Sequence, residues 1–311
     1  MPKLPSLPAP TVSKVPPPVF VDPNLITQPR VPVTFPKRIG VVLGNLKGVN
    51  IPALKYLVVQ LNSRQDVFEF EVLGCDVQDP LIQALSREEP IDKETVRAEI
   101  AAFLNRFRLY SESLIQRMKL KEALPDYFVL VTMAQFVDEY YTMRQGSMSI
   151  VALGNWKRKM APPSILEFII TLLIREGVAA VSPSLRGSVH LGTKGCLCDF
   201  TLHLEDARFK VLQGFVCSHC RDALASDGHA NLAEELSAVL DKTWLGKTSD
   251  PSAPAGIVSN LGFDLFLTKG LKPTKWESFL GNIQQEGVKE LLKLIGGVVL
   301  AGLLLWLGLK K

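Results

Sequence analysis

The chain has 311 residues, a formal net charge of +4 at pH 7 and 47% hydrophobic residues, which gives room for one large domain or two smaller ones. The charge is only mildly basic and no run of lysine and arginine is interleaved with aromatic residues, so we expect no nucleic-acid partner. No apolar stretch near the N-terminus resembles a secretory signal peptide, which leads us to expect a body in the cytosol. The five cysteines are an odd number, and in that reducing compartment they argue against a framework of disulfides.

Proline dominates the first 37 residues. They hold eleven of the 21 prolines of the chain, including Pro16, Pro17 and Pro18 in a row. This composition favours the polyproline II conformation and opposes a packed core. We therefore expect residues 1–37 to be a disordered, proline-rich leader and not a recognition ligand.

Strand-like and helix-like patterns alternate from residue 38 onward. Short apolar runs or two-residue alternation predict strands, and apolar residues every three or four positions predict helices. The expected strands cover 39–44, 67–73, 127–133 and 149–153, and the expected helices cover 51–61, 96–120 and 165–175. Ser164 is placed to cap the last helix, which is apolar nearly all round and should be central. This alternation implies a three-layer α/β body over residues 38–228.

The chain after residue 228 changes character. Residues 229–273 are expected to form a helical extension and a linker, with the helix over 230–245 and the linker over 249–255. Thr274 and Glu277 then form a capping-box pattern that opens an amphipathic helix over 274–290. We expect this last helix to lie along a membrane surface.

The C-terminal segment is the most apolar part of the chain. Between 291 and 309 only Lys293 is charged, and a lysine pair follows. At about 1.5 Å per helical residue this run spans roughly the 30 Å hydrocarbon core of a bilayer, with Lys293 reaching toward the headgroups. We therefore predict a transmembrane tail anchor over 291–311, a lipid bilayer as partner and a body that faces the cytosol. The alternative is a buried core helix.

Four cysteines gather within 25 residues. Cys196 and Cys198 form one pair, Cys217 and Cys220 form a Cys-x-x-Cys pair further on, and His190 stands six residues before Cys196. In an intracellular chain this clustering indicates a Zn²⁺ site, because thiolates bind the ion tetrahedrally and two knuckles let distant segments share it.

The favoured ligand set is His190, Cys196, Cys217 and Cys220, with Cys198 packed inside, because a Cys-x-Cys turn is tight for two sulfur ligands of one ion. Cys198 remains the alternative to His190 as the fourth ligand. Free buried thiols and a redox-active Cys-x-x-Cys are the other interpretations, but no thioredoxin-like frame surrounds Cys217.

The stretch His190-LGTKG-Cys196-LC-DFTLHLEDARFKVLQGFV-Cys217-SH-Cys220 resembles the C-terminal zinc segment of archaemetzincins, a family of metallopeptidases. Those proteins carry a Cys-x4-Cys-x-Met run and, downstream, a Cys-x-x-Cys. By this resemblance His190 takes the place of the first cysteine and Cys198 that of the methionine. The resemblance extends over residues 38–225 but is motif-specific only over 190–224. It implies a three-layer metzincin-like body with a Cys/His zinc knuckle.

The chain differs from that family at the position of the catalytic zinc motif. Archaemetzincins carry the motif H-E-x-x-H-x-x-G, in which two histidines one helical turn apart hold a catalytic zinc and the glutamate acts as general base. No histidine precedes His190 in this chain. Glu167 lies in the helix where such a motif would fall, but its neighbours Leu166 and Ile170 cannot bind zinc. We therefore expect a structural zinc site and no catalytic one.

Two polar clusters are weaker candidates. Residues 138–141 follow a strand end, where sites are common, although a solvated helix start is the plainer interpretation. A second cluster flanks the knuckles and is expected to support the metal ligands. It consists of Asp199, Glu205, Asp206 and Arg208.

Together these features predict a membrane-anchored, zinc-stabilised, non-catalytic module: a pseudopeptidase-like sensor, scaffold or effector with an unidentified protein partner. One alternative is a membrane-bound hydrolase with a non-standard active site, although no nucleophile elbow occurs. Another is a membrane-disrupting effector that forms homo-oligomers through its tail, because Gly297 and Ala301 have the spacing that permits close helix contact.

Overall fold

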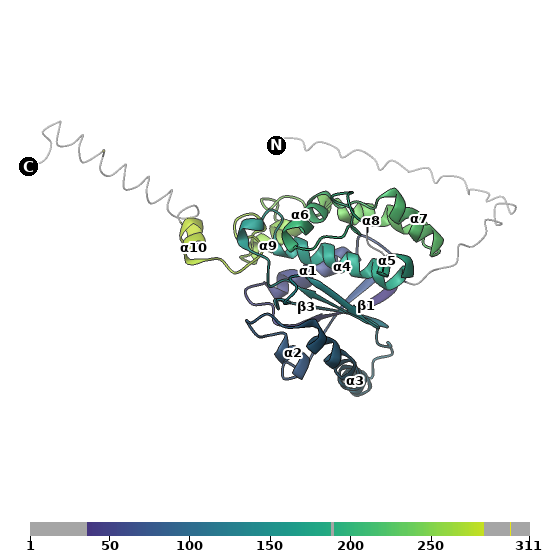
Figure 1. The fold of residues 1–311 in the computed structure, drawn as a ribbon. Coiled ribbons are helices and arrows are strands. Elements are labelled where there is room, and N and C mark those ends of the chain that lie inside the picture. The colour runs from purple at the N-terminus through teal and green to yellow at the C-terminus, as the bar shows by residue number, and fades with distance from the viewer. Residues whose placement is uncertain (1–35, 188–189, 283–298, 300–311) are drawn as a thin grey trace, which may run out of the picture. The chain divides into compact units, whose positions relative to one another are not determined.

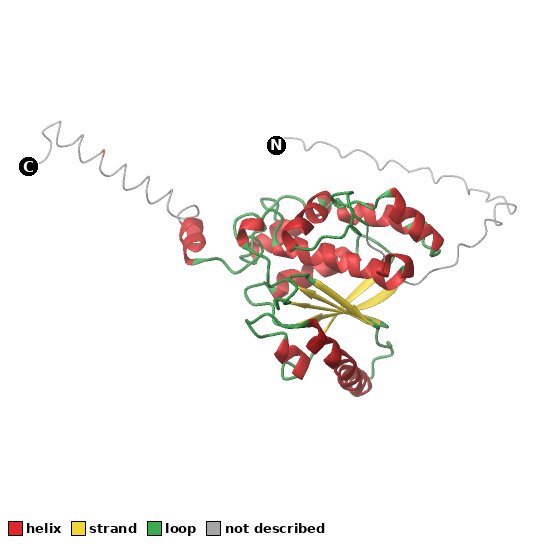
Figure 2. Ribbon diagram, in the orientation of Figure 1, coloured by secondary structure: helices red, strands yellow, loops and turns green. Residues whose placement is uncertain are grey.

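A five-stranded sheet forms the centre of the protein (Figures 1 and 2). The computed structural model describes residues 36–187, 190–282 and 299. The strands are β1 (Lys37–Leu43), β2 (Phe68–Leu73), β3 (Tyr127–Thr132), β4 (Thr142–Gln145) and β5 (Met148–Ala152), in the order β2-β1-β3-β5-β4. Four of these strands are parallel, and β4 pairs antiparallel with β5 at one edge.

The central strands are continuous apolar runs because both faces of a mainly parallel sheet are covered. Every residue of β3 and β5 is buried. At the opposite edge from β4, strand β2 alternates instead, with Phe68 and Phe70 buried and Glu69 exposed. The two kinds of strand pattern therefore report the position of each strand in the sheet.

Helices cover both faces of the sheet. On one face lie α1 (Ile51–Asn62) and α4 (Ile165–Val181), and on the other lie α2 (Pro80–Ala84) and α3 (Lys93–Met118) (Figure 1). Helix α4 begins at the predicted cap: the Ser164 hydroxyl accepts from the Glu167 N–H, and the Glu167 carboxylate accepts from the Ser164 N–H. Nearly every residue of α4 is buried, which shows that its far side is covered as well.

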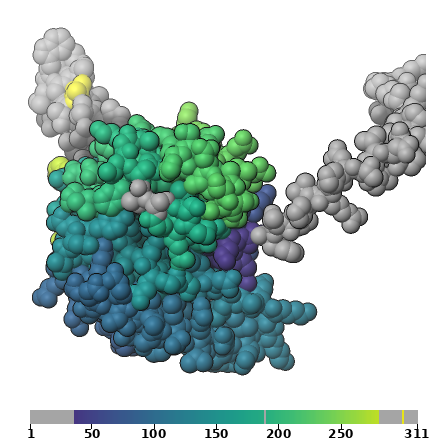
Figure 3. Space-filling view, turned by 45° about the vertical axis from the view of Figure 1, so that its right-hand side comes forward, coloured from purple at the N-terminus to yellow at the C-terminus, as the bar shows by residue number. Residues whose placement is uncertain are grey.

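The helices that follow α4 form this outer cover (Figure 1). They are α5 (Pro183–Gly187), α6 (Leu204–Gln213), α7 (Ser218–Ser226), α8 (Leu232–Leu240) and α9 (Pro254–Asn260), with a 3₁₀ turn at Thr243–Leu245. Another 3₁₀ turn, at Arg158–Met160, precedes α4. Contacts join α6 to α4, α7 to α5 and α8, and α9 to α1. In the space-filling view the later residues, in green, lie together on one side of the earlier residues, in blue and teal (Figure 3). They make a further layer outside the three that the sequence predicts.

The mixed α/β prediction is confirmed, with local differences. Strand β4 was not expected, and residues 138–141 form a loop before it and not the start of a helix. The predicted boundary between 228 and 229 crosses one core, because Leu224 and Leu236 belong to the same buried cluster. Ala255, expected in a linker, is buried in the first turn of α9.

The end of the described body is α10 (Lys275–Asn282), which follows the predicted capping box. The Thr274 N–H donates to the Glu277 carboxylate, and the Glu277 N–H donates to Thr274 Oγ1. Among the described residues, no helix has both the length and the apolar character that a membrane crossing needs. Of the proline-rich leader predicted over 1–37, residues 1–35 lie outside the described residues, whereas Lys37 already belongs to β1. The second half of the predicted amphipathic helix and, apart from Val299, the predicted tail anchor also lie outside the described residues.

Candidate metal centre

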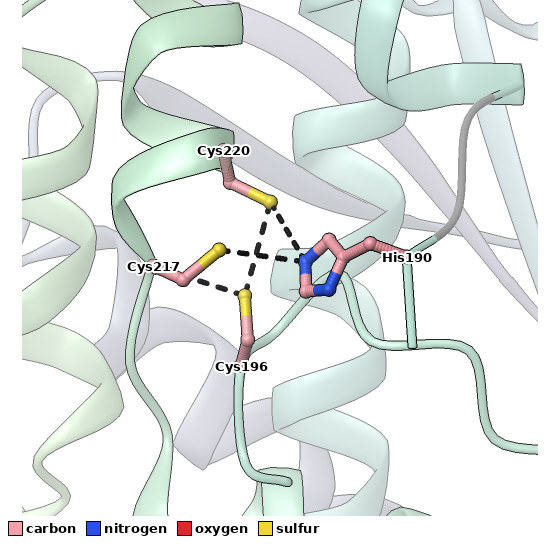
Figure 4. A group of neighbouring side chains, drawn as sticks. All are labelled: His190, Cys196, Cys217 and Cys220. Atoms are coloured by element: carbon pink, nitrogen blue, oxygen red, sulfur yellow. Dashed lines mark hydrogen bonds between the residues drawn. The ribbon is translucent and has the colours of Figure 1, made fainter. Parts of the chain in front are cut away.

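Four candidate ligand atoms meet between the loop that precedes α6 and the first turn of α7 (Figure 4). They are Nε2 of His190 and the Sγ atoms of Cys196, Cys217 and Cys220, and all lie within 4.8 Å of one another. Cys196 and Cys220 are fully buried, and His190 and Cys217 are partly buried. Among the described residues, these four form the group of metal-binding side chains whose ligand atoms lie close enough together to hold one ion.

Three of the six distances within the group are close to the edges of a zinc tetrahedron. With Zn–S bonds of about 2.3 Å and Zn–N bonds of about 2.0 Å, tetrahedral geometry separates two sulfur ligands by about 3.8 Å and a sulfur from a nitrogen by about 3.5 Å. The Sγ atoms of Cys196 and Cys220 are 3.8 Å apart. His190 Nε2 lies 3.1 Å from Cys220 Sγ and 3.5 Å from Cys217 Sγ. Donor types and spacing therefore define a Cys₃His zinc site.

Asp199 fixes the orientation of the histidine. Its Oδ1 atom lies 3.0 Å from His190 Nδ1 and accepts a 2.7 Å hydrogen bond from Thr193 Oγ1. A hydrogen on Nδ1 leaves the lone pair of Nε2 free to face the thiols, which is the tautomer a metal ligand needs. The expected supporting role of Asp199 is thus present. Arg208 donates instead to the Pro162 carbonyl, at 2.7 Å, and has no contact with the ligands.

Backbone pairing brings the two cysteine segments together. Cys196 pairs with Phe215 in an isolated bridge, and the Leu197 N–H donates to the Phe215 carbonyl at 2.8 Å. Cys217 is the N-cap residue of α7, so Cys220 falls in the first turn of that helix. The Cys217 N–H also points at Cys196 Sγ, 3.5 Å away, as backbone donors do toward thiolate ligands.

Cys198 is 1% exposed and stands outside the group of four. Hydrogen bonding with Cys196 and Cys220 lowers the pKa of the Cys198 thiol, and the charges of Arg175 and Lys210 act in the same direction. Hydrogen bonding with Cys196 and Cys198 raises the pKa of the Cys220 thiol. The neighbouring thiols thus oppose one another's deprotonation, because one thiolate raises the pKa of the next thiol. A bound dication would hold its sulfur ligands as thiolates together.

The remaining candidates of the sequence lie elsewhere. Glu167 is engaged in the cap of α4. His203 Nδ1 lies 3.3 Å from the Glu139 carboxylate on the surface. The ring of His219 meets that of His190 edge-on at 5.8 Å and is not one of the four candidate ligands. The sequence does not predict a charged pocket beside the centre, which includes Arg144 and Arg175, because its residues come from four separate segments of the chain.

The fold and the donor set define a mixed α/β protein with a Cys₃His zinc site. No family model matches the chain, and no curated protein is significantly similar to it in sequence. Among solved structures, the chain is similar to archaemetzincin from Methanopyrus kandleri, with 12% identity and a TM-score of 0.40, over 63% of this chain and 98% of that one. At that identity and TM-score the likeness supports no inference about activity.

Proposed function

We propose that the chain is a zinc-stabilised, non-catalytic module held at a membrane. One observation supports a structural role of zinc: three cysteine sulfurs and one imidazole nitrogen lie within 4.8 Å of one another, and four protein ligands would leave a tetrahedral ion no open position for water or substrate. The site would join the loop at Cys196 to the start of α7. Because α7 packs on α5 and α8, the ion would stabilise the outer helical layer.

The non-catalytic part of the proposal is supported by the places of the other reactive side chains. The Glu167 carboxylate accepts a 2.7 Å hydrogen bond from the Ser164 N–H, so it is engaged in the helix cap, and it is not one of the four candidate ligands. His203 is half exposed and lies beside Glu139. A sensor, scaffold or effector that acts through a protein partner fits this arrangement better than a hydrolase.

The membrane part rests on the apolar run over 291–309 and on the helix that leads toward it. In α10 the side chains of Trp276 and Phe279 are 67% and 52% exposed, and their rings stack at 5.6 Å. Exposed aromatic rings next to a candidate span suit the interface between headgroups and water. We place the body on the cytosolic side because three thiolate ligands require reduced cysteines, and we propose that the tail also carries homo-oligomer contacts.

Elemental analysis of purified full-length protein tests the zinc proposal. We expect one zinc per chain, and we expect Cys217→Ser to lower both zinc content and thermal stability. The Tm should fall by roughly 10 °C, since each kcal/mol lost moves the Tm of a body of this size by about 2–4 °C.

Two matched variants serve as controls. Cys75 is a free, partly buried cysteine outside the cluster, so Cys75→Ser should keep zinc and Tm. Cys198→Ser should also keep the zinc, because His190 supplies the fourth ligand. Native protein without stoichiometric metal, whose cluster thiols react freely, would overturn the proposal. Chelator-sensitive cleavage of a peptide library would instead favour the hydrolase.

A further inference from the structure

Two buried cations beside the metal centre form no direct ion pair with a carboxylate among the described residues. Arg175 on α4 is 5% exposed and Lys210 on α6 is 3% exposed, and within the described residues neither forms an ion pair. Burial lowers the pKa of Lys210 to about 8, and the nearby charge of Arg175 acts in the same direction. Buried charges are costly unless they are paired, so these two side chains call for an anion.

The nearby acids are already engaged. Glu176 receives two hydrogen bonds from Arg144, at 2.7 and 2.5 Å. The Asp199 carboxylate contacts His190 Nδ1 and accepts a hydrogen bond from Thr193. The Lys210 ammonium donates instead to the backbone carbonyl of Asp199, at 2.5 Å. Glu176 and Asp199 therefore act on Arg175 and Lys210 only through their nearby charge and make no direct ion pair with them.

One donor of Arg175 is left without a partner. Its Nη2 atom donates to the Leu185 carbonyl at 2.9 Å, whereas its Nη1 atom is buried and has no hydrogen-bond partner among the described residues. An unsatisfied buried donor in a charged group costs free energy comparable to a lost hydrogen bond, or more. Such donors mark places where a ligand or a water completes the structure.

A narrow pocket joins these groups. Its enclosed space is about 10 Å³, roughly the room that one water molecule takes, and the rest of the hollow opens to solvent. The residues that line it are Tyr140, Tyr141, Thr142, Arg144, Leu172, Arg175, Cys198, Asp199 and Lys210. Three cationic side chains lie on its wall. Apolar surface comes from Leu172 and from Tyr140, whose ring packs against that of Phe200 with 5.5 Å between the centroids.

We propose that this pocket, which we call the Arg175 pocket, binds the carboxylate group of a small organic acid. A guanidinium presents parallel donors that match a carboxylate, and Lys210 adds a point charge. The enclosed space suits the carboxylate group alone, so the short carbon chain of the acid would lie in the open mouth of the pocket. The proposal is independent of the structural role of zinc and of the membrane tether, because its residues are not metal ligands.

Ligand-observed NMR with ¹³C-labelled acetate tests the proposal on zinc-loaded, full-length protein. We expect saturable broadening of the acetate signal with a dissociation constant in about the millimolar range, as befits four heavy atoms. Arg175→Gln and Lys210→Met should each weaken binding at least about tenfold, since each removes a charged contact. Lys242→Met is the matched control, because burial lowers the pKa of Lys242 to about 8 as well, yet its ammonium donates to the Val211 carbonyl outside the pocket.

Three results would overturn the proposal. Wild-type protein could show no saturable effect of acetate, which would mean that a water or the Cys198 thiolate already satisfies Arg175. Chloride at the same concentration could displace acetate completely, which would make the pocket a halide site. All variants could bind acetate equally, which would place binding elsewhere. Should Arg175→Gln not fold, Arg175→Lys keeps the charge but loses the planar fork, and its binding should still be weaker than that of wild type.

Discussion

At the scale of single residues, Arg144 and Glu176 form an ion pair whose carboxylate is fully buried. Glu176 is fully buried, and burial alone would raise the pKa of its carboxyl group. The charge and hydrogen bonds of Arg144 outweigh burial and hold that pKa below its ordinary value. A lowered carboxyl pKa contributes stability that is present above the unfolded-state pKa and is lost as the pH falls through the folded-state pKa.

Glu176→Gln should therefore destabilise the body by about 3 kcal/mol or more at pH 7, because it leaves Arg144 buried without its partner. Urea unfolding of wild type and variant measures this difference. Adding Arg144→Met should recover part of the loss, and the gap between wild type and Glu176→Gln should shrink below about pH 4. Equal stability of both proteins at pH 7 would show that the pair contributes nothing.

Residue spacing in the sequence predicts the metal ligands but not the cationic pocket beside them. The ligands His190, Cys196, Cys217 and Cys220 could be grouped because they stand close together in the chain and share a ligand chemistry. Arg175 and Lys210 could not be grouped with Arg144, because an isolated arginine or lysine in a sequence is most often a solvated surface charge. Only the packing of α4, α6 and β4 brings them to one pocket.

At the scale of elements, the turn that carries Cys196 depends on glycine. Gly195 has φ +116°, and an added Cβ would lie 3.1 Å from both Gln213 Cβ and Phe215 Cε1. Gly195→Ala should destabilise the protein by about 1–3 kcal/mol and weaken zinc retention against a chelator, because it strains the backbone and pushes the bridge to Phe215 apart.

Gly192→Ala is the control for this prediction. Gly192 also has a positive φ, +93°, but no described atom lies within 4 Å of its added Cβ. It should therefore cost only the backbone strain, about 1 kcal/mol. Thermal unfolding and zinc release measured side by side separate the two effects, and equal behaviour of both variants would disprove the tight contact at Gly195.

The sequence predicts a helix or strand correctly where the local apolar pattern alone determines it, and fails where contacts with distant residues determine it. The apolar spacing of α1 and the apolar runs of β1 and β3 are enough to predict those elements. Strand β4 has the sequence TMRQ with one apolar residue, so only the two-residue loop Gly146-Ser147 before β5 could have indicated a hairpin. The prediction ended α4 at Arg175, because Arg175 and Glu176 resemble a polar helix end, whereas both are buried and the helix continues to Val181.

At the scale of the whole molecule, the position of the outer helices on α4 follows from no local signal, although the sequence predicts a helix over 230–245, where α8 lies. Their apolar faces predict burial but not the surface that receives them, and α4 could receive them because it is apolar nearly all round. The relation of this body to a membrane depends on the run over 291–309, which lies outside the described residues apart from Val299. It remains a prediction that an experiment can decide.

Carbonate extraction of membranes is that experiment. Full-length protein should stay in the pellet, and a chain that ends at Gln285 should move to the supernatant, because only the former can insert a helix. Leu300→Arg, at the middle of the apolar run, should release part of the protein, since a charge at the bilayer centre costs about 2.5–3.5 kcal/mol. Leu267→Arg, a substitution at a 42% exposed leucine of the body, should leave the distribution unchanged. Full-length protein that washes off would instead assign the run to a buried or interfacial helix, and Trp276 and Phe279 would then need a protein surface as their partner.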